Sequence, residues 1–121
     1  MAQIGYINAH GTATPVNDGV EAKAYGAFLG DVLPSTRISS TKAAIGHTLG
    51  AAGAVEALFA IEALRTGHLP PQLNLQAPIP EMAPALVGEK ESSNGMQHAM
   101  SVNLGFGGSN AALIFSRNPP P

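Results

Sequence analysis

Residues 37–66 read RISSTKAAIGHTLGAAGAVEALFAIEALRT, in which a short β-prone run, a glycine turn and a long apolar run follow one another directly. The first run predicts a strand over 37–41, because it is short and rich in residues compatible with β structure. The long run predicts a helix over about 48–66 that is apolar on nearly every side. This apolar pattern is typical of a helix that is buried between two layers of secondary structure. The stretch therefore predicts an α/β fold with a buried central helix.

The rest of the chain predicts three more strands and one more helix. Residues 4–9 predict a strand that ends at His10, and Asp18 with Glu21 three positions later is typical of the capping box that begins a helix. We expect that helix to stop at Gly30. Residues 98–104 and 111–116 predict an antiparallel hairpin.

Two segments are expected to lack regular structure. Residues 70–97 contain five prolines, which interrupt helices and strands repeatedly, so we expect an irregular surface loop there. Residues 118–121 predict a frayed tail. The whole chain of 121 residues has the size of one domain.

Composition excludes several classes of function. A net charge of −2 with only 12% charged residues offers no basic stripe for nucleic acid. The absence of cysteine excludes disulfides, thiolate metal sites and a cysteine nucleophile in this chain. The first residues lack the basic and apolar regions of a signal peptide, and the longest apolar stretch is too short to span a bilayer. We therefore expect a cytoplasmic location and no membrane partner.

Two histidines follow β-prone runs and stand beside glycines: His10 in NAHGT and His47 in AIGHT. Open α/β sheets carry their chemistry at the carboxyl ends of strands, so we predict that both belong to an active site. We expect His47 just before or at the start of the long helix, where the macrodipole disfavours a charged ring and a neutral ring could donate to a developing oxyanion. The alternative is a helix cap with no chemical role.

Lys42 and Glu56 are charged residues in apolar surroundings. Each alone would be costly to bury, whereas a Lys42–Glu56 ion pair neutralises itself and could hold His47 in place. The alternative is a solvated Glu56. We predict the pair, because the residues around Glu56 leave little polar surface.

The stretch GFGGSN (105–110) combines three glycines with Phe106. Glycines permit tight backbone geometry, so a backbone N–H here could point into the site and join an oxyanion hole, with Phe106 as a mobile wall. A hairpin turn with a buried aromatic residue would have a similar sequence. No lysine follows the glycines as a Walker phosphate loop requires.

Three motifs follow one another along the chain: NAHGTATP (8–15), SSTK with GHTLGAAG (39–42 and 46–53), and GFGGSN (105–110). Together they closely resemble the β-ketoacyl-acyl carrier protein synthases of the elongating type. The resemblance spans residues 4–115 but covers only the C-terminal part of the family's catalytic unit. It implies an incomplete C-terminal half of the layered thiolase-like fold, with a mixed sheet covered by helices. A thiolase would normally carry a second catalytic cysteine in this half.

The resemblance implies a decarboxylative Claisen condensation in fatty acid or polyketide biosynthesis. In that reaction an acyl chain is loaded on a cysteine, and malonyl-acyl carrier protein loses carbon dioxide and attacks the thioester. The resemblance implies that His10 and His47 bind the malonyl thioester carbonyl. The implied supporting residues are Lys42 and Glu56 beside the histidines, Thr12 and Thr14 on the phosphopantetheine arm, and Phe106 as a gate whose backbone N–H joins the oxyanion hole.

The resemblance also implies partners. The family's nucleophilic cysteine lies in its N-terminal half, and this chain has no cysteine, so we expect the isolated chain to be inactive and to be completed by that half. Acyl carrier protein and a homo- or heterodimer are further implied partners. Alone, the chain is expected to leave its opening strand with an unpaired edge and to expose a large apolar surface.

We expect neither a cofactor nor a metal ion. Some members of the family bind a monovalent cation beside the residue that corresponds to Glu56, and they have an asparagine at the position of Val102. The valine argues against that cation in this chain. Two other functions remain open. One is a non-catalytic subunit similar to a chain length factor, against which retention of both histidines and Lys42 argues. The other is a histidine metal site, for which a nearby carboxylate set is lacking.

Overall fold

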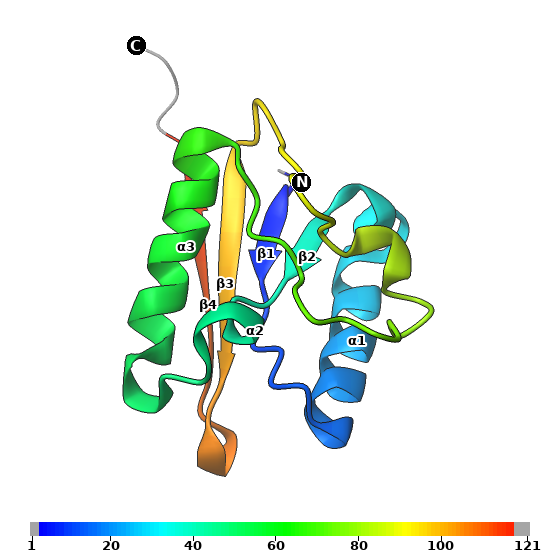
Figure 1. The fold of residues 1–121 in the computed structure, drawn as a ribbon, viewed down its shortest axis with the longest axis vertical. Coiled ribbons are helices and arrows are strands. Elements are labelled where there is room, and N and C mark those ends of the chain that lie inside the picture. Colours follow the sequence, from blue (N-terminus) through cyan, green and yellow to red (C-terminus); the bar gives the residue numbers. More distant parts are fainter. Residues whose placement is uncertain (1–2, 118–121) are drawn as a thin grey trace.

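A four-stranded mixed sheet with a long helix on each face forms the body of the chain (Figure 1). The computed structural model describes residues 3–117, so the tail expected at 118–121 lies outside the described residues. Strands β1, β2 and β3 run parallel, and β4 is antiparallel to β3. The order across the sheet is β2-β1-β3-β4. The strands are β1 (Tyr6–Asn8), β2 (Arg37–Ser39), β3 (His98–Leu104) and β4 (Asn110–Ser116).

Three α-helices and four short 3₁₀ segments connect the strands. The helices are α1 (Pro15–Leu29), α2 (Lys42–Ile45) and α3 (Ala52–Thr66). The 3₁₀ segments are η1 (Gly30–Ser35), η2 (Leu49–Ala51), η3 (Ala83–Ala85) and η4 (Phe106–Gly108). The predicted α/β class, the mixed sheet and the β3–β4 hairpin are therefore confirmed. Within residues 3–117 no helix has the length and apolar character needed to cross a bilayer.

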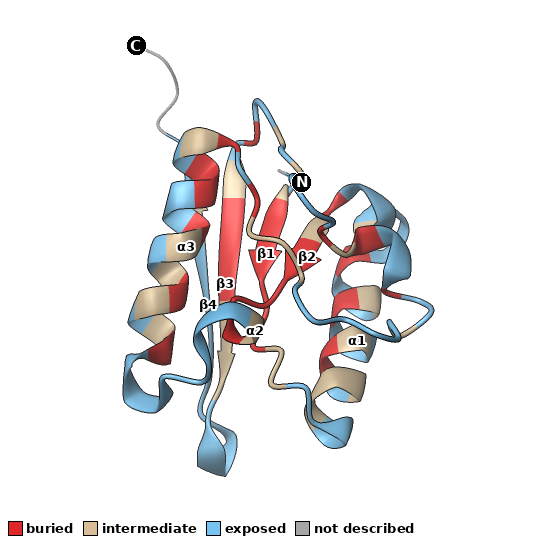
Figure 2. Cartoon of the chain, in the orientation of Figure 1, coloured by how far each residue is buried: buried red, intermediate tan, exposed pale blue. Residues whose placement is uncertain are grey.

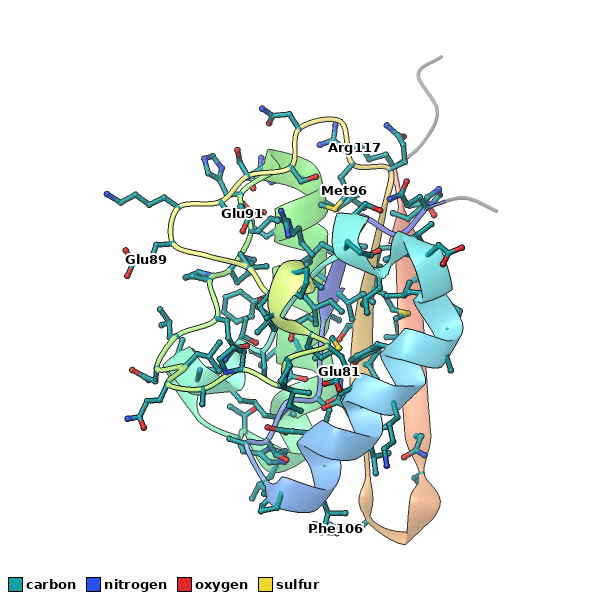
Figure 3. The ribbon with its side chains drawn as sticks, turned by 90° about the vertical axis from the view of Figure 1, so that its right-hand side faces the viewer. Glu81, Glu89, Glu91, Met96, Phe106 and Arg117 are labelled. Atoms are coloured by element: carbon teal, nitrogen blue, oxygen red, sulfur yellow. The ribbon has the colours of Figure 1, made fainter. Side chains whose placement is uncertain are left out.

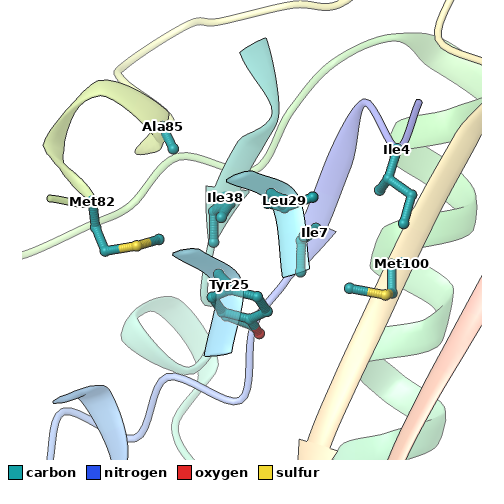
Figure 4. Packing of buried hydrophobic residues seen from close by; sticks show 9 residues of the cluster. Ile4, Ile7, Tyr25, Leu29, Ile38, Met82, Ala85 and Met100 are labelled. Atoms are coloured by element: carbon teal, nitrogen blue, oxygen red, sulfur yellow. The ribbon is translucent and has the colours of Figure 1, made fainter. Parts of the chain in front are cut away.

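Helix α1 covers one face of the sheet through an apolar cluster (Figure 4). Tyr25 and Leu29 of α1 pack there with Ile7, Ile38 and Met100 from three strands. The helix ends before Gly30, as predicted, and Gly30 adopts a positive φ of 52°. Burial of these side chains is the driving force that holds α1 on the sheet.

The predicted start of α1 is wrong. The helix begins at Pro15 rather than after Asp18, because proline lacks an N–H and has a preset φ that suits the first helical position. Asp18 therefore lies inside the first turn, where its carboxylate accepts the N–H of Ala13 at 3.2 Å. Glu21 reaches back over the preceding loop instead of completing a capping box.

Helix α3 covers the other face and is buried along one side only (Figure 2). Ala60 and Ala63 face the sheet, where they pack with Tyr6 and other buried residues. On the opposite side, Leu58 is 65% exposed and Ile61 is 41% exposed. The central helix is thus half-buried within this chain, and the expected exposed apolar surface is confirmed. The helix begins at Ala52, later than predicted, because η2 occupies the preceding turn.

Strand β1 is central, so the expectation of an unpaired edge on the opening strand is wrong. β1 pairs with β2 on one side and with β3 on the other. The edge strands of the described sheet are β2 and β4, and β4 is exposed along almost its whole length. Strand order depends on contacts between residues distant in sequence, which local patterns do not encode.

The segment 70–97 has little regular structure, as predicted, but it is more than a surface loop. Met82 and Ala85 are buried in the cluster beneath α1. Val87 and Met96 are buried in the cluster beneath α3, and the Val87 N–H donates to the Ile38 carbonyl at 3.0 Å. This segment therefore completes both apolar clusters.

Candidate active site

The carboxyl ends of β1, β2 and β3 meet at one end of the sheet, the lower end in Figure 1. His10 follows β1, Lys42 follows β2, and Gly105 follows β3. A cavity of about 850 Å³ opens at this end. The predicted site residues that line it are His10, Thr12, Thr14, His47 and Phe106. The structure thus brings together residues that are almost 100 positions apart in the sequence.

The two histidine rings lie next to each other. Their centroids are 5.6 Å apart, and the ring planes meet at 86°, in an edge-to-face arrangement. His10 is buried, and its Nδ1 atom forms no hydrogen bond with any described residue. Burial lowers the pKa of His10 below its usual value of 6.5, and the nearby Lys42 charge lowers it further, against smaller opposite effects of Glu21 and Glu56. A neutral His10 ring is therefore favoured.

His47 is oriented by a backbone amide rather than by the long helix. Thr48 and η2 separate it from α3, so His47 lies just before the long helix rather than at its first residue. The N–H of Leu49 donates to His47 Nδ1 at 3.1 Å, and Leu49 adopts a positive φ of 50° to do so. Because Nδ1 is the acceptor, the ring proton is placed on Nε2. His47 therefore has a hydrogen-bond donor on its other edge.

Lys42 and Glu56 form the predicted buried ion pair. The Lys42 ammonium donates to Glu56 Oε1, and the two side chains are 5% and 2% exposed. Lys42 is the first residue of α2 and Glu56 lies on the sheet-facing side of α3. The pair thus ties α2 to α3 and keeps a positive charge near His10.

The loop after His10 has a tightly constrained backbone. Gly11 adopts a positive φ of 44°, and a Cβ atom at this position would lie only 2.4 Å from Ser40 Cβ. Ala13 also adopts a positive φ, of 58°, which is uncommon for a residue other than glycine. Only glycine therefore fits between His10 and Thr12.

Sequence reasoning missed the residue that holds this loop. Glu21 accepts the backbone N–H groups of His10 and Gly11 at 2.9 and 2.7 Å. The only sequence signal was the pairing of Asp18 with Glu21, which also fits a capping box. Glu21 is therefore part of the site, although it does not line the histidine cavity.

The remaining predicted residues lie at the mouth of the cavity. The hydroxyls of Thr12 and Thr14 are 3.0 Å apart and exposed. Phe106 lies in the β3–β4 turn, at the lower end of the molecule in Figure 3, and it is fully exposed, so within residues 3–117 it does not close the cavity. Gly107 and Gly108 after it adopt positive φ values of 72° and 83°, which this turn requires.

Two kinds of metal site can be compared with the structure. Within residues 3–117 no three His, Cys, Asp or Glu side chains come together, so His10 and His47 lack a third ligand for a histidine site. By contrast, Asn8 Oδ1, Glu56 Oε2 and Ser101 Oγ are buried and form no hydrogen bond with a described residue. Each is an oxygen atom of the kind that hard cations prefer as a ligand, and a buried oxygen without a partner is uncommon in folded proteins.

Val102 lies on the face of β3 that is turned away from Glu56. Side chains alternate between the faces of a strand, and Val102 packs with the apolar cluster beneath α1. Glu56 belongs to α3, which covers the other face of the sheet. The valine side chain therefore points away from Glu56, and the expectation that this chain binds no cation stays a prediction.

Comparisons with known proteins give matches over most of this chain. Residues 1–76 match the family model described as "Beta-ketoacyl synthase, C-terminal domain". A 3-oxoacyl-[acyl-carrier-protein] synthase 2 of Rhizobium meliloti is 47% identical over 116 residues, which are 96% of this chain and 27% of that protein. The chain therefore spans about a quarter of the length of this curated relative.

Two solved structures show the same fold. A β-ketoacyl synthase from Burkholderia phymatum is 39% identical, with a TM-score of 0.85 over 96% of this chain and 28% of that one. The ishigamide ketosynthase/chain length factor is 30% identical, with a TM-score of 0.86 over 96% of this chain and 28% of that one. The chain thus corresponds to part of a larger layered fold in each of these proteins.

Proposed function

The chain belongs to the β-ketoacyl synthase family, whose C-terminal domain it matches, and we propose that it supplies the malonyl-binding part of a 3-oxoacyl-acyl carrier protein synthase site. The observation that carries this proposal is the pair of histidine rings, 5.6 Å apart in one cavity. Two neighbouring N–H donors can both form hydrogen bonds to one carbonyl oxygen. A thioester that loses carbon dioxide gains negative charge on this oxygen, which the two donors stabilise.

The proposed chemistry uses the histidines as donors to the malonyl thioester oxygen. When the bond between the malonyl carboxylate and the adjacent carbon breaks, its electron pair moves into the thioester carbonyl and carbon dioxide leaves. The resulting enolate oxygen carries the developing charge, which the Nε2–H of His47 and an N–H of His10 stabilise. The enolate carbon then attacks an acyl thioester, a new carbon–carbon bond forms, and the thiolate is expelled.

The supporting residues keep this arrangement fixed. Lys42 and Glu56 hold α2 and α3 together, and Lys42 favours a neutral His10. Thr12 and Thr14 present hydroxyls at the cavity mouth, where the phosphopantetheine arm of acyl carrier protein would enter. Phe106 lies at the same mouth and would act as its gate.

The nucleophile must come from outside these 121 residues, because they contain no cysteine. We propose that a further part of the protein, or a second subunit, carries the nucleophilic cysteine and completes the site. The whole synthase is proposed to be a homo- or heterodimer. The exposed side of α3, with Leu58 and Ile61, is an apolar surface suited to packing against it. Without that part, the chain is proposed to be inactive.

The alternative function is a non-catalytic partner similar to a chain length factor. The structural similarity to a ketosynthase/chain length factor protein favours it. The paired histidines and the buried lysine argue against it, since a scaffold has no need of two hydrogen-bond donors in a cavity.

A fusion protein tests the proposed function. Residues 1–121 would be joined to the preceding part of the Rhizobium meliloti synthase, and we call this fusion the reconstituted synthase. With acyl- and malonyl-acyl carrier protein, it is expected to release carbon dioxide and form 3-oxoacyl-acyl carrier protein, measured by mass spectrometry. A fusion that folds and accepts the acyl chain on its cysteine but forms no 3-oxoacyl product would contradict the proposal.

A further inference from the structure

Two amide side chains of the segment 70–97 form hydrogen bonds with the backbone at and just before α2. Gln72 Oε1 accepts the backbone N–H of Ser40, in the loop after β2, at 2.9 Å. The side-chain amide of Asn74 donates to the carbonyl of Ala43, in α2, at 3.3 Å. These two contacts lie on either side of the buried lysine of the ion pair. The irregular segment therefore supports the stretch that carries this lysine and the second histidine.

Ser40, which Gln72 contacts, links the two loops of the site. It is only 4% exposed, and its hydroxyl donates to the His10 carbonyl and accepts the Lys42 N–H, each at 3.4 Å. Ser40 also packs against Gly11 so closely that no side chain fits there. A buried N–H needs an acceptor, and the Gln72 oxygen supplies it for Ser40. Gln72 thus holds the residue that touches both the His10 loop and the start of α2.

Helix α2 has little support from packing within the described part of the chain. Lys42 is its one buried residue there, and residues 44–50 are exposed. With only four residues, α2 also leaves most of its carbonyl groups without a partner inside the helix. The contact with Asn74 and the ion pair with Glu56 therefore supply much of its support. His47 follows the end of α2 after a single glycine, so its position depends on that of the helix.

The start of the segment is itself anchored to the sheet. The Gln72 N–H donates to the Val87 carbonyl at 3.0 Å, and the Val87 N–H donates to the Ile38 carbonyl at 3.0 Å. The hydroxyl of Ser39 donates to the Pro70 carbonyl at 2.6 Å. Since Ile38 and Ser39 belong to β2, the Gln72 side chain extends from a backbone that is tied to a strand. Such a backbone is suited to hold a functional loop in place.

We propose that Gln72 and Asn74 are positioning residues for the second histidine of the site. They hold Ser40 and α2 in place and so fix His47 beside His10. The inference rests on the proposed function, and it adds that the irregular segment after α3 takes part in the site. Without the Gln72 oxygen, the buried Ser40 N–H loses its acceptor, and the backbone between β2 and α2 relaxes from the arrangement seen here.

Replacing Gln72 by methionine in the reconstituted synthase tests the proposal. Methionine keeps the length of the side chain but has no oxygen to accept the Ser40 N–H. We expect kcat for malonyl decarboxylation to fall about tenfold to hundredfold, because small misplacement of a catalytic group has effects of this size. Acylation of the cysteine should stay unchanged, because the histidines act only on the malonyl thioester in the proposed chemistry. A general loss of stability would lower both steps instead.

A conservative variant and a control position separate the hydrogen bond from packing. Gln72→Glu keeps an oxygen that can accept the Ser40 N–H, so it should restore most of the decarboxylation rate that Gln72→Met loses. Gln76 is an exposed glutamine of the same segment. Gln76→Met and Gln76→Glu introduce the same side chains at that exposed position, and they should affect neither step.

Replacing Asn74 by glycine tests the second contact. Asn74 is exposed and adopts a positive φ of 57°, which glycine adopts without strain. The variant therefore removes the hydrogen bond to Ala43 with little effect on folding. We expect a selective loss of decarboxylation that is smaller than in Gln72→Met, because this contact is exposed to water. If Gln72→Met does not fold, Asn74→Gly takes its place and must show the selective loss.

Each outcome decides a different question. Selective loss of decarboxylation in Gln72→Met and Asn74→Gly, restored at position 72 by glutamate, supports the positioning role. Unchanged decarboxylation, equal losses in both steps, or a Gln72→Glu variant as slow as Gln72→Met overturns it while the proposed function stands. If the unsubstituted fusion accepts the acyl chain but does not decarboxylate malonyl-acyl carrier protein, the proposed function itself fails, and the role of Gln72 and Asn74 fails with it.

Discussion

Replacing either His10 or His47 by alanine is expected to lower condensation by the reconstituted synthase about 10²- to 10³-fold, the usual effect of deleting one oxyanion donor. The rings lie 5.6 Å apart in one cavity, so each change removes one of the two proposed donors to the same oxygen. The loss should fall on kcat for carbon dioxide release, because the donors act most strongly on the charge that develops as the bond breaks.

His68→Ala is the matched control for both changes. His68 is an exposed histidine after the C-terminal end of α3, away from the cavity, so its loss should leave the rate unchanged. Condensation that is indifferent to His10→Ala and His47→Ala would favour the scaffold function over the catalytic one.

Replacing Glu56 by leucine is expected to lower the free energy of unfolding by about 3–5 kcal/mol, because it leaves the Lys42 ammonium buried without a counter-charge. Both side chains of this pair are at most 5% exposed, so water cannot take the place of the carboxylate. Urea unfolding of the reconstituted synthase, followed by circular dichroism, measures the change.

Two further variants separate the ion pair from simple packing. Glu89→Leu, at an exposed glutamate in the segment 70–97, should leave the unfolding midpoint unchanged. The double variant Lys42→Met with Glu56→Leu should recover much of the lost stability, because it removes both buried charges. A double variant that is less stable than Glu56→Leu would show that the leucine is harmful for another reason.

Local sequence signals predicted the parts of the fold that local chemistry decides. Gly30 ends α1 because its backbone adopts a positive φ there, and a glycine-rich turn joins β3 to β4. Lys42 and Glu56 could be paired from the sequence because an isolated charge in such apolar surroundings is unstable. The proximity of His10 and His47 followed from the rule that strand ends meet at one edge of a sheet.

Other features depend on contacts that the sequence does not display. The central position of β1 arises from pairing with strands about 30 and 90 residues away. Prolines in 70–97 indicated irregular backbone correctly but gave no sign that Met82 and Val87 complete the two apolar clusters. The spacing of Glu21 from Asp18 fits a helix cap as well as it fits hydrogen bonds to the loop after His10, so the sequence does not distinguish the two roles.

Whether His10 and His47 hold one thioester oxygen is tested most directly by carbon-13 NMR of a bound malonyl thioester analogue that cannot lose carbon dioxide. The analogue would carry the label at its thioester carbonyl and would be added to the reconstituted synthase. Two N–H donors withdraw electron density from the carbonyl carbon, so its resonance should move downfield on binding, and part of that shift should disappear in each of His10→Ala and His47→Ala. A bound analogue whose carbonyl resonance does not move, or moves equally in both variants and the unsubstituted protein, would contradict the proposed role of the two histidines.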